Sequence, residues 1–255
     1  MSNEHNEHIH RQFDPRAEAY LASAVHAEGD DLRQMAALVG QRRDAVGLDM
    51  GCGGGHVSFC LAPLLSKVVA CDLSASMLAV VAAEAKRRGL NNVATQQAAV
   101  ESLPFADVSF DVAVSRYSAH HWQQLAPGLA QLRRVVKDDG LAIFMDVISP
   151  GVPLLDTWLQ SLELLRDPSH NRDATLAEWC AQLCAAGFRV DSLATYRLRL
   201  EFSSWVARMK TPASHIAVLR SLQQSASRAV LDYFAIEDDG SFTVDTMLIA
   251  AKPVG

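Results

Sequence analysis

A glycine-rich turn at residues 49–55 constrains the fold of this chain more than any other feature. The turn reads Asp-Met-Gly-Cys-Gly-Gly-Gly, follows a hydrophobic run of strand length at residues 45–50, and precedes a helical pattern. Glycine lets a backbone approach a ligand closely, and such a turn directs the N-terminus of the next helix at that ligand. The sequence therefore predicts a strand–turn–helix unit that suits several nucleotide-like ligands.

Short β-branched runs alternate with helical patterns between residues 44 and 147, which indicates βαβ units and a buried parallel sheet. We expect strands at residues 45–50, 67–71, 93–97, 110–115, 141–147, 188–195 and 241–252. We expect helices between the first five strands at residues 54–65, 75–88 and 125–137. The predicted fold class is α/β, a Rossmann-like, seven-stranded, mostly parallel sheet with helices on both faces.

Helices are also expected on either side of this core. Amphipathic patterns predict N-terminal helices at residues 11–23 and 30–39, and further helices near 154–165 and 176–186. Residues 196–234 are too many for a hairpin connection and show helical apolar spacing, so we expect a C-terminal helical cap insertion that sets substrate specificity. The expected division is an N-terminal cover (1–40), a cofactor-binding core (41–150), and cap helices with the final strands (151–255), all in one globular unit.

Composition limits the partners of the chain. It has 29 Asp and Glu against 23 Lys and Arg, a net charge of -6 that is the wrong sign for binding nucleic acid. No window approaches eighteen uncharged apolar residues, so we expect no membrane span. The five cysteines lie mostly in apolar segments, which favours a reducing cytoplasm over a disulfide framework. No metal-ligand spacing supports a metal site, and a homodimer stays an open expectation.

The turn lacks one glycine of a dinucleotide-binding pattern. That pattern reads Gly51-x-Gly53-x-x-Gly, but the last position is His56, whose side chain would crowd the helix packing and the pyrophosphate. A nicotinamide-dependent oxidoreductase is therefore the weaker alternative. A second acidic residue, Asp72, ends the next expected strand, where a carboxylate can accept two hydrogen bonds from a ribose diol. Its alternative role is helix capping together with Ser74.

The spacing Asp49-x-Gly51-x-Gly53-x-Gly55 resembles motif I of class I S-adenosylmethionine-dependent methyltransferases. Residues 98–105 (AAVESLPF) and 109–113 (SFDVA) resemble the adenine-side loop and fourth strand of the ubiquinone/menaquinone-biosynthesis C-methyltransferase-like branch. The resemblance runs from about residue 13 to residue 147 and implies S-adenosyl-L-methionine as cofactor. It departs at Ala99, because this branch often has an acidic residue there that contacts the adenine.

The resemblance also implies which residues contact the cofactor. The backbone of Gly51, Cys52 and Gly53 would lie against its amino-acid part. Asp49 would bind its ammonium group directly or through water, and Asp72 would bind its ribose. The other implied contacts are Leu73 and Met77 beside the adenine, Val100 or Glu101 in place of the contact missing at Ala99, Ser115, and Tyr20 as a cover from the N-terminal helix.

The segment at residues 115–122 (SRYSAHHW) follows the fourth strand, at the edge where open α/β sheets bind ligands. Methyl transfer is an in-line displacement, so the enzyme must align donor and acceptor and, where needed, remove a proton. We predict His121 as general base or substrate orienter, His120 as the second candidate, and Arg116 as the residue that places an anionic or carbonyl-bearing substrate. Neighbouring side chains in a helix diverge by about 100°, so we expect one histidine to face away.

The function predicted from these residues is an S-adenosylmethionine-dependent methyltransferase that acts on a small-molecule acceptor. The sequence leaves open whether carbon, oxygen or nitrogen is methylated. The alternative is a regulatory or scaffold protein that binds the cofactor without transferring the methyl group, which the substitution at Ala99 suggests.

Overall fold

Seven strands form one sheet in the order β3-β2-β1-β4-β5-β7-β6. The computed structural model describes residue 12 and residues 29–254. The first five strands run parallel: β1 (Arg42–Met50), β2 (Leu65–Asp72), β3 (Val93–Gln97), β4 (Phe110–Arg116) and β5 (Val136–Ile148). The last strand, β7 (Phe242–Pro253), is antiparallel to both β5 and β6 (Phe188–Leu200). The predicted Rossmann-like, mostly parallel sheet is thereby confirmed.

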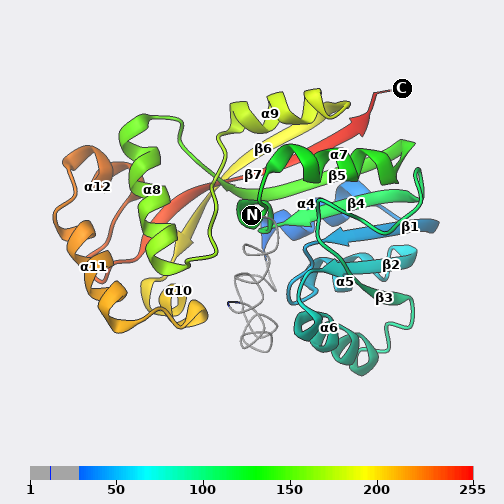
Figure 1. The fold of residues 1–255 in the computed structure, drawn as a ribbon, viewed down its shortest axis with the longest axis horizontal. Helices are drawn as coiled ribbons and strands as arrows, with labels where there is room; N and C mark the ends of the chain where they lie inside the picture. Colours follow the sequence, from blue (N-terminus) through cyan, green and yellow to red (C-terminus); the bar gives the residue numbers. More distant parts are fainter. Residues whose placement is uncertain (1–11, 13–28, 255) are drawn as a thin grey trace.

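Helices cover both faces of the sheet, as expected (Figure 1). On one face, α7 (Leu125–Val135) and α9 (Leu176–Ala185) pack on the strands through one large apolar cluster. On the other face, α4 (Asp30–Val39) and α5 (His56–Leu61) share a cluster with the central strands, and α6 (Ala75–Arg87) packs on β2 and the glycine-rich turn. The bounds of α4 are those predicted for the second N-terminal helix, whereas the first, at 11–23, lies outside the described residues apart from Gln12.

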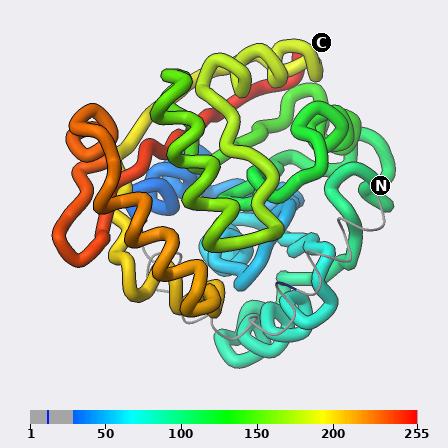
Figure 2. The backbone as a smooth tube through the Cα atoms, turned by 60° about the vertical axis from the view of Figure 1, so that its left-hand side comes forward, coloured from blue at the N-terminus to red at the C-terminus, as the bar shows by residue number. Residues whose placement is uncertain are grey.

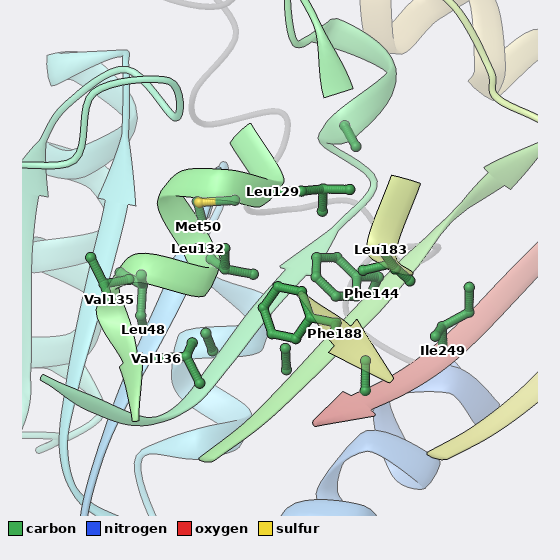
Figure 3. Packing of buried hydrophobic residues seen from close by; sticks show 14 of the residues in the cluster. Leu48, Met50, Leu129, Leu132, Val135, Val136, Phe144, Leu183, Phe188 and Ile249 are labelled. Carbon is green, nitrogen blue, oxygen red and sulfur yellow. The ribbon is translucent and has the colours of Figure 1, made fainter. Parts of the chain in front are cut away.

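The cluster under α7 and α9 holds the C-terminal strands to the rest of the sheet. Figure 3 shows Phe144 of β5 close to Phe188 of β6, with Leu183 of α9 beside them. The two phenyl rings are 6.3 Å apart and meet edge to face, and Trp179 packs on Phe144 at 5.5 Å. Burying an apolar side chain of this size contributes roughly 1.5–3 kcal/mol. These contacts fix the carboxyl end of β5, which borders the site.

The helix after the glycine-rich turn is shorter than predicted. We expected it at residues 54–65, but α5 spans only His56–Leu61. Gly55 has a φ of 81°, which lies outside the right-handed helical region and sets the helix start. Pro63 follows the helix and opposes its continuation. The expected N-cap of α6 is confirmed, because Ser74 Oγ accepts a hydrogen bond from Met77 N.

Four helices form the cap at one end of β6 and β7: α8 (Pro153–Arg166), α10 (Phe202–Met209), α11 (Ala213–Gln224) and α12 (Arg228–Phe234). Figures 1 and 2 show α11 and α12 beside α8, away from β2 and β3. Because β6 continues to Leu200, the cap insertion begins after that residue and not at 196. The cap has its own core, in which Trp205 packs on Phe242 of β7 at 5.0 Å. None of the described helices has the length and apolar character needed to cross a membrane.

Candidate active site

The glycine-rich turn adopts a backbone that other residues rarely tolerate. Gly51, Gly53 and Gly55 have φ values of 71°, 48° and 81°. A Cβ atom on Gly51 would lie only 1.9 Å from Ser118 Oγ, and that hydroxyl is held by the indole N–H of Trp122 at 3.1 Å. Gly51 therefore brings the turn against the segment that follows β4.

The N–H groups of the turn are used to hold it in place. Gly51 and Cys52 both donate to the carbonyl of Cys71, at 2.8 and 3.0 Å, and Gly53 donates to Asp72 Oδ2 at 2.8 Å. These bonds fix the turn to the end of β2. The turn thus offers a closely approachable backbone surface, and these three N–H groups point to β2 and Asp72 instead of a ligand.

An open cavity of about 1200 Å³, counted with its mouth, extends from this turn to the cap. Nine of the predicted site residues line it: Gly51, Gly53, Asp72, Leu73, Met77, Val100, Glu101, His120 and His121. Ala99 lines it as well, so the position that departs from the branch pattern does border the cavity. The structure therefore brings together residues from the ends of β1, β2, β3 and β4 at one edge of the sheet.

Asp72 has a structural role in addition to its place in the cavity wall. Its Oδ2 accepts the Gly53 N–H, and its Oδ1 accepts the N–H of Ser74 at 2.9 Å. The capping role expected as the alternative is thus present, since Asp72 fixes the N–H groups on both sides of the end of β2. Asp72 also lines the cavity, and its contact with a ribose stays a prediction.

Asp49 does not line the cavity. It is 1% exposed, and its Oδ2 accepts hydrogen bonds from the N–H and the hydroxyl of Ser58 at 2.9 and 2.6 Å. Burial raises the pKa of Asp49 to about 7, although the hydrogen bonds from Ser58 oppose this rise. In this structure the carboxylate joins β1 to the first turn of α5.

Three other predicted residues are also absent from the cavity wall: Cys52, Ser115 and Arg116. Cys52 and Ser115 are buried. The Arg116 guanidinium turns to α4, where Nε donates to Asp31 Oδ2 at 2.6 Å and Nη2 donates to Oδ1 at 3.2 Å. Arg116 therefore joins β4 to α4 through a contact between residues 85 apart in the chain, which the sequence did not reveal. Tyr20 lies outside the described residues.

Both histidines line the cavity, so the expectation that one would face away is wrong. They end η2, a 3-10 turn at Ala119–His121, and their rings are 4.2 Å apart. His120 Nδ1 lies 2.6 Å from Asp146 Oδ1 at the end of β5, and His121 Nδ1 lies 3.2 Å from the carbonyl of Ser169. The sheet and the loop after α8 enclose η2 from two sides, and both diverging side chains therefore border the same space.

The two histidines carry different charges. Burial alone would lower the pKa of His120, but the carboxylate of Asp146 outweighs it and raises the pKa to about 9. Burial and the positive charge of His120 lower the pKa of His121 below its ordinary value. Near pH 7 the pair therefore consists of a charged His120 beside Asp146 and a neutral His121.

The cap, β6 and the loop before α9 contribute wall residues that we did not name from the sequence. They are Glu163 and Arg166 of α8, Trp205 and Arg208 of α10, Leu198 and Leu200 of β6, and Asp173 of the loop before α9. The sequence pattern could have identified Glu163 and Arg166 as candidate site residues. They are charged residues three positions apart on a helix face that also holds the buried Leu159 and Leu162. Buried charges within an apolar helix face often mark a functional site.

The backbone turns sharply between β4 and η2. Tyr117 has a φ of 49°, rare for a residue with a side chain, and its N–H donates to the carbonyl of Met145 at 2.8 Å. Strained residues of this kind concentrate at functional sites. Within the part of the chain that is described, His, Cys, Asp and Glu side chains form no group of three or more arranged to hold a metal ion.

Residues 48–144 match the family model described as a methyltransferase domain. The chain is 49% identical over 201 residues to the uncharacterized protein YafE of Escherichia coli (strain K12), which covers 79% of this chain and 97% of that protein. It is 34% identical over 224 residues to the uncharacterized methyltransferase YcgJ of Bacillus subtilis, with 88% of each covered. The crystal structure of YcgJ matches with a TM-score of 0.84 and 32% identity over 88% of this chain and 98% of that chain.

One relative belongs by name to the ubiquinone/menaquinone-biosynthesis branch that the sequence resembles. The chain is 30% identical over 127 residues to the ubiquinone/menaquinone biosynthesis C-methyltransferase UbiE of Francisella philomiragia, which covers 48% of this chain and 51% of that protein. This similarity is confined to about half of each protein.

Proposed function

Since this chain belongs to the S-adenosylmethionine-dependent methyltransferase family, we propose that it transfers a methyl group to a small-molecule acceptor held between the sheet and the cap. One observation supports this proposal above the others: a single cavity connects the glycine-rich turn and Asp72 with the histidine pair and the cap. A donor at one end of this cavity and an acceptor at the other would share a continuous space, as an in-line transfer requires.

The residues at the turn fit the cofactor. Gly51 and Gly53 border the cavity without side chains, so a ligand can lie directly against the backbone. Asp72 offers a carboxylate to the ribose hydroxyls, and Leu73 and Met77 offer apolar surface to the adenine. Glu101 lines the same end, and its Oε1 already accepts the N–H of Gln123 at 3.1 Å. Asp49, Cys52 and Ser115 would support this end from behind the wall.

When bound, the cofactor supplies an electrophilic methyl group on a sulfonium centre. The side chains that would act on the methyl acceptor are the two histidines of η2. His121 is neutral near pH 7, so it can accept a proton from the methyl acceptor. The Asp167 carboxylate, whose Oδ2 lies 3.9 Å from His121 Nε2, would stabilise the imidazolium that results. His120, held charged by Asp146, would donate a hydrogen bond that orients the acceptor.

A small molecule is the favoured acceptor because the cavity is bounded by the cap on the side away from the sheet. The relative UbiE is a ubiquinone/menaquinone biosynthesis C-methyltransferase, and its name refers to small molecules. The net charge of -6 disfavours nucleic acid as a substrate. The five free cysteines support a cytoplasmic location.

Two titrations and a turnover assay test this function. Calorimetry with S-adenosylmethionine and with S-adenosylhomocysteine should show binding of both. A panel of small nucleophiles with carbon, oxygen and nitrogen acceptor atoms should then release S-adenosylhomocysteine from S-adenosylmethionine. A properly folded protein that binds neither compound would contradict the proposal, and binding without turnover across the panel would favour a regulatory role.

A further inference from the structure

A second, smaller cavity borders His120. Its volume is about 630 Å³, counted with its mouth. Its outer wall includes the ion pair of Arg172 and Glu178, whose side chains are 46% and 43% exposed. Its inner wall includes Asp146 and Trp179, which are both 2% exposed. This second cavity therefore extends from the protein surface to the buried carboxylate that holds η2.

A partition separates the second cavity from the first, which extends from the glycine-rich turn to the cap. Four residues border both cavities and form this partition: His120, Trp122, Val147 and Asp173. Of the two cavities, His121 borders only the first and Asp146 borders only the second. The three side chains His121, His120 and Asp146 thus lead across the partition from one cavity to the other.

The distances between these side chains suit the movement of a proton. The rings of His120 and His121 are 4.2 Å apart, and His120 Nδ1 lies 2.6 Å from Asp146 Oδ1. His121 Nδ1 lies 3.2 Å from the carbonyl of Ser169, which can only accept, so in neutral His121 this nitrogen carries the hydrogen. The other nitrogen, Nε2, is then the one that can take a proton from an acceptor.

Asp173 supplies an independent observation at the partition. It is 2% exposed, borders both cavities, and its Oδ2 has no hydrogen-bond partner among the described residues. A buried carboxyl oxygen is normally hydrogen-bonded to protein or to ordered water. Since two cavities meet at this residue, water is the partner that its surroundings can supply. Asp173 therefore marks a place where water can bind within the partition.

The charges of the two histidines are linked. Burial and the positive charge of His120 both lower the pKa of His121. The electrostatic effect is mutual, so a proton gained by His121 lowers the pKa of His120 through the same interaction. Two imidazolium rings this close together would repel each other. Uptake of a proton by His121 therefore favours loss of the proton that His120 already holds.

We propose that the second cavity is the exit for the proton that methylation releases. In the transfer, the bond between sulfur and methyl breaks with its electron pair left on sulfur, and the acceptor atom bonds the methyl group and loses its hydrogen as a proton. His121 Nε2 takes this proton, and His120 gives its Nδ1 proton to Asp146 Oδ1. Water in the second cavity, held in part by Asp173, carries that proton to the surface. This inference rests on the proposed function, since it deepens the role of the same histidine pair.

The starting state returns after the product leaves. The proton on His121 then passes to His120 through water that enters the first cavity, so each turnover removes one proton and leaves the pair unchanged. The alternative exit is the first cavity itself. During the transfer, however, the cofactor and the acceptor would occupy that space, whereas the second cavity shares only its partition residues with it and stays open to water.

Exchange of the His120 Nδ1 hydrogen with water tests this route in the full chain saturated with S-adenosylhomocysteine. NMR of protein with ¹⁵N-labelled histidine measures the exchange rate. Gln182→Phe extends a ring from α9 into the second cavity and should slow the exchange about tenfold or more. Ala181→Phe, at the exposed neighbouring position of α9, is the matched control and should leave the rate unchanged. Leu198→Phe, which narrows the first cavity, should also leave it unchanged.

Two results of this experiment would overturn the inference. One is a wild-type exchange rate in Gln182→Phe, and the other is an equal slowing by Leu198→Phe, which would place the route in the first cavity. If Gln182→Phe does not fold, Ala174→Leu decides in its place, because Ala174 borders the second cavity from the loop before α9.

Turnover supplies a second readout with any acceptor that reacts. Gln182→Phe should complete its first turnover at the wild-type rate, because Asp146 can hold the displaced proton once, and should then slow about tenfold in the steady state. Rapid-quench measurements give both rates, and a wild-type steady-state rate would overturn the inference. Wild-type protein that binds no S-adenosylhomocysteine, or that methylates no acceptor, contradicts the proposed function, whereas the exchange experiment needs no turnover.

Discussion

His120 Nδ1 lies 2.6 Å from Asp146 Oδ1, and the other oxygen of the same carboxylate accepts the N–H of Ala119 at 2.9 Å. One buried carboxylate at the end of β5 thus fixes both the backbone of η2 and the ring orientation of its histidine. The pair also sets the charge difference between His120 and His121.

Asp146→Asn should remove the charge that holds His120 protonated. The pKa of His120 should fall from about 9 to below its ordinary value of 6.5, because burial then dominates. Histidine proton chemical shifts followed by NMR across pH measure this change. Asp138→Asn, at an exposed partner of Arg133, is the matched control and should leave the His120 titration unchanged.

The same pair predicts how stability depends on pH. The folded-state pKa of His120 is raised, so its contribution is fully present below about pH 6.5 and is lost as pH rises through about 9. Urea unfolding should show the largest difference between wild type and Asp146→Asn below pH 6.5, a shrinking difference between pH 6.5 and 9, and the smallest difference above pH 9. A difference that stays constant over this range would rule out His120 as its source.

His121→Asn should lower kcat by about 100-fold or more if this histidine removes the acceptor proton. The Kd for S-adenosylhomocysteine should stay near the wild-type value, since His121 is proposed to act on the acceptor. His215→Asn provides the comparison, because His215 hydrogen-bonds the Leu165 carbonyl from α11 and does not line the cavity. Wild-type turnover in His121→Asn would remove it from the mechanism.

Asp72→Asn should weaken binding of S-adenosylhomocysteine by roughly 10- to 100-fold, the loss expected for one or two hydrogen bonds to a charged group. The amide oxygen can keep one of the two backbone hydrogen bonds that Asp72 accepts, which limits the structural damage. Calorimetry measures the affinity, and Asp107→Asn at an exposed position is the control. Wild-type affinity would contradict the ribose assignment.

Gly51→Ala and Gly40→Ala separate the cost of backbone strain from the cost of close approach. Both glycines have positive φ, 71° and 62°, but a Cβ on Gly40 meets no atom within 4 Å, whereas one on Gly51 collides with Ser118. Gly51→Ala should lower the free energy of unfolding by about 1–3 kcal/mol more than Gly40→Ala. Denaturant titration measures both, and equal losses would mean that Ser118 moves without cost.

The sequence predicted the fold well where patterns are local. The bounds of β3 and α4 agree with those expected, because short apolar runs with polar ends specify them. β5 begins at Val136, five residues before the predicted start, since the polar residues 137–139 conceal its first pairing with β4. That pairing depends on Phe110, a tertiary contact that no local pattern contains.

The part of the cavity at the glycine-rich turn was predictable from the sequence, and the part lined by the cap helices was not. Gly51 and Asp72 follow strands that must end at the same edge of a parallel sheet, so their proximity follows from topology. Arg166 and Trp205 meet only because α8 and α10 pack together, 39 residues apart in the chain. Arg116 was predicted to lie in the site, but its ion pair with Asp31 of α4 turns its side chain away from the cavity.

The position of β7 between β5 and β6 affects the order in which the molecule can be assembled during synthesis. β6 leaves the ribosome before the strand that joins it to β5, and the cap core cannot close without Phe242 and Val244 of β7. The parallel half of the sheet, with the glycine-rich turn and Asp72, contains its own strand pairings. A nascent chain interrupted before β7 would therefore hold a formed glycine-rich turn beside an unformed cap core.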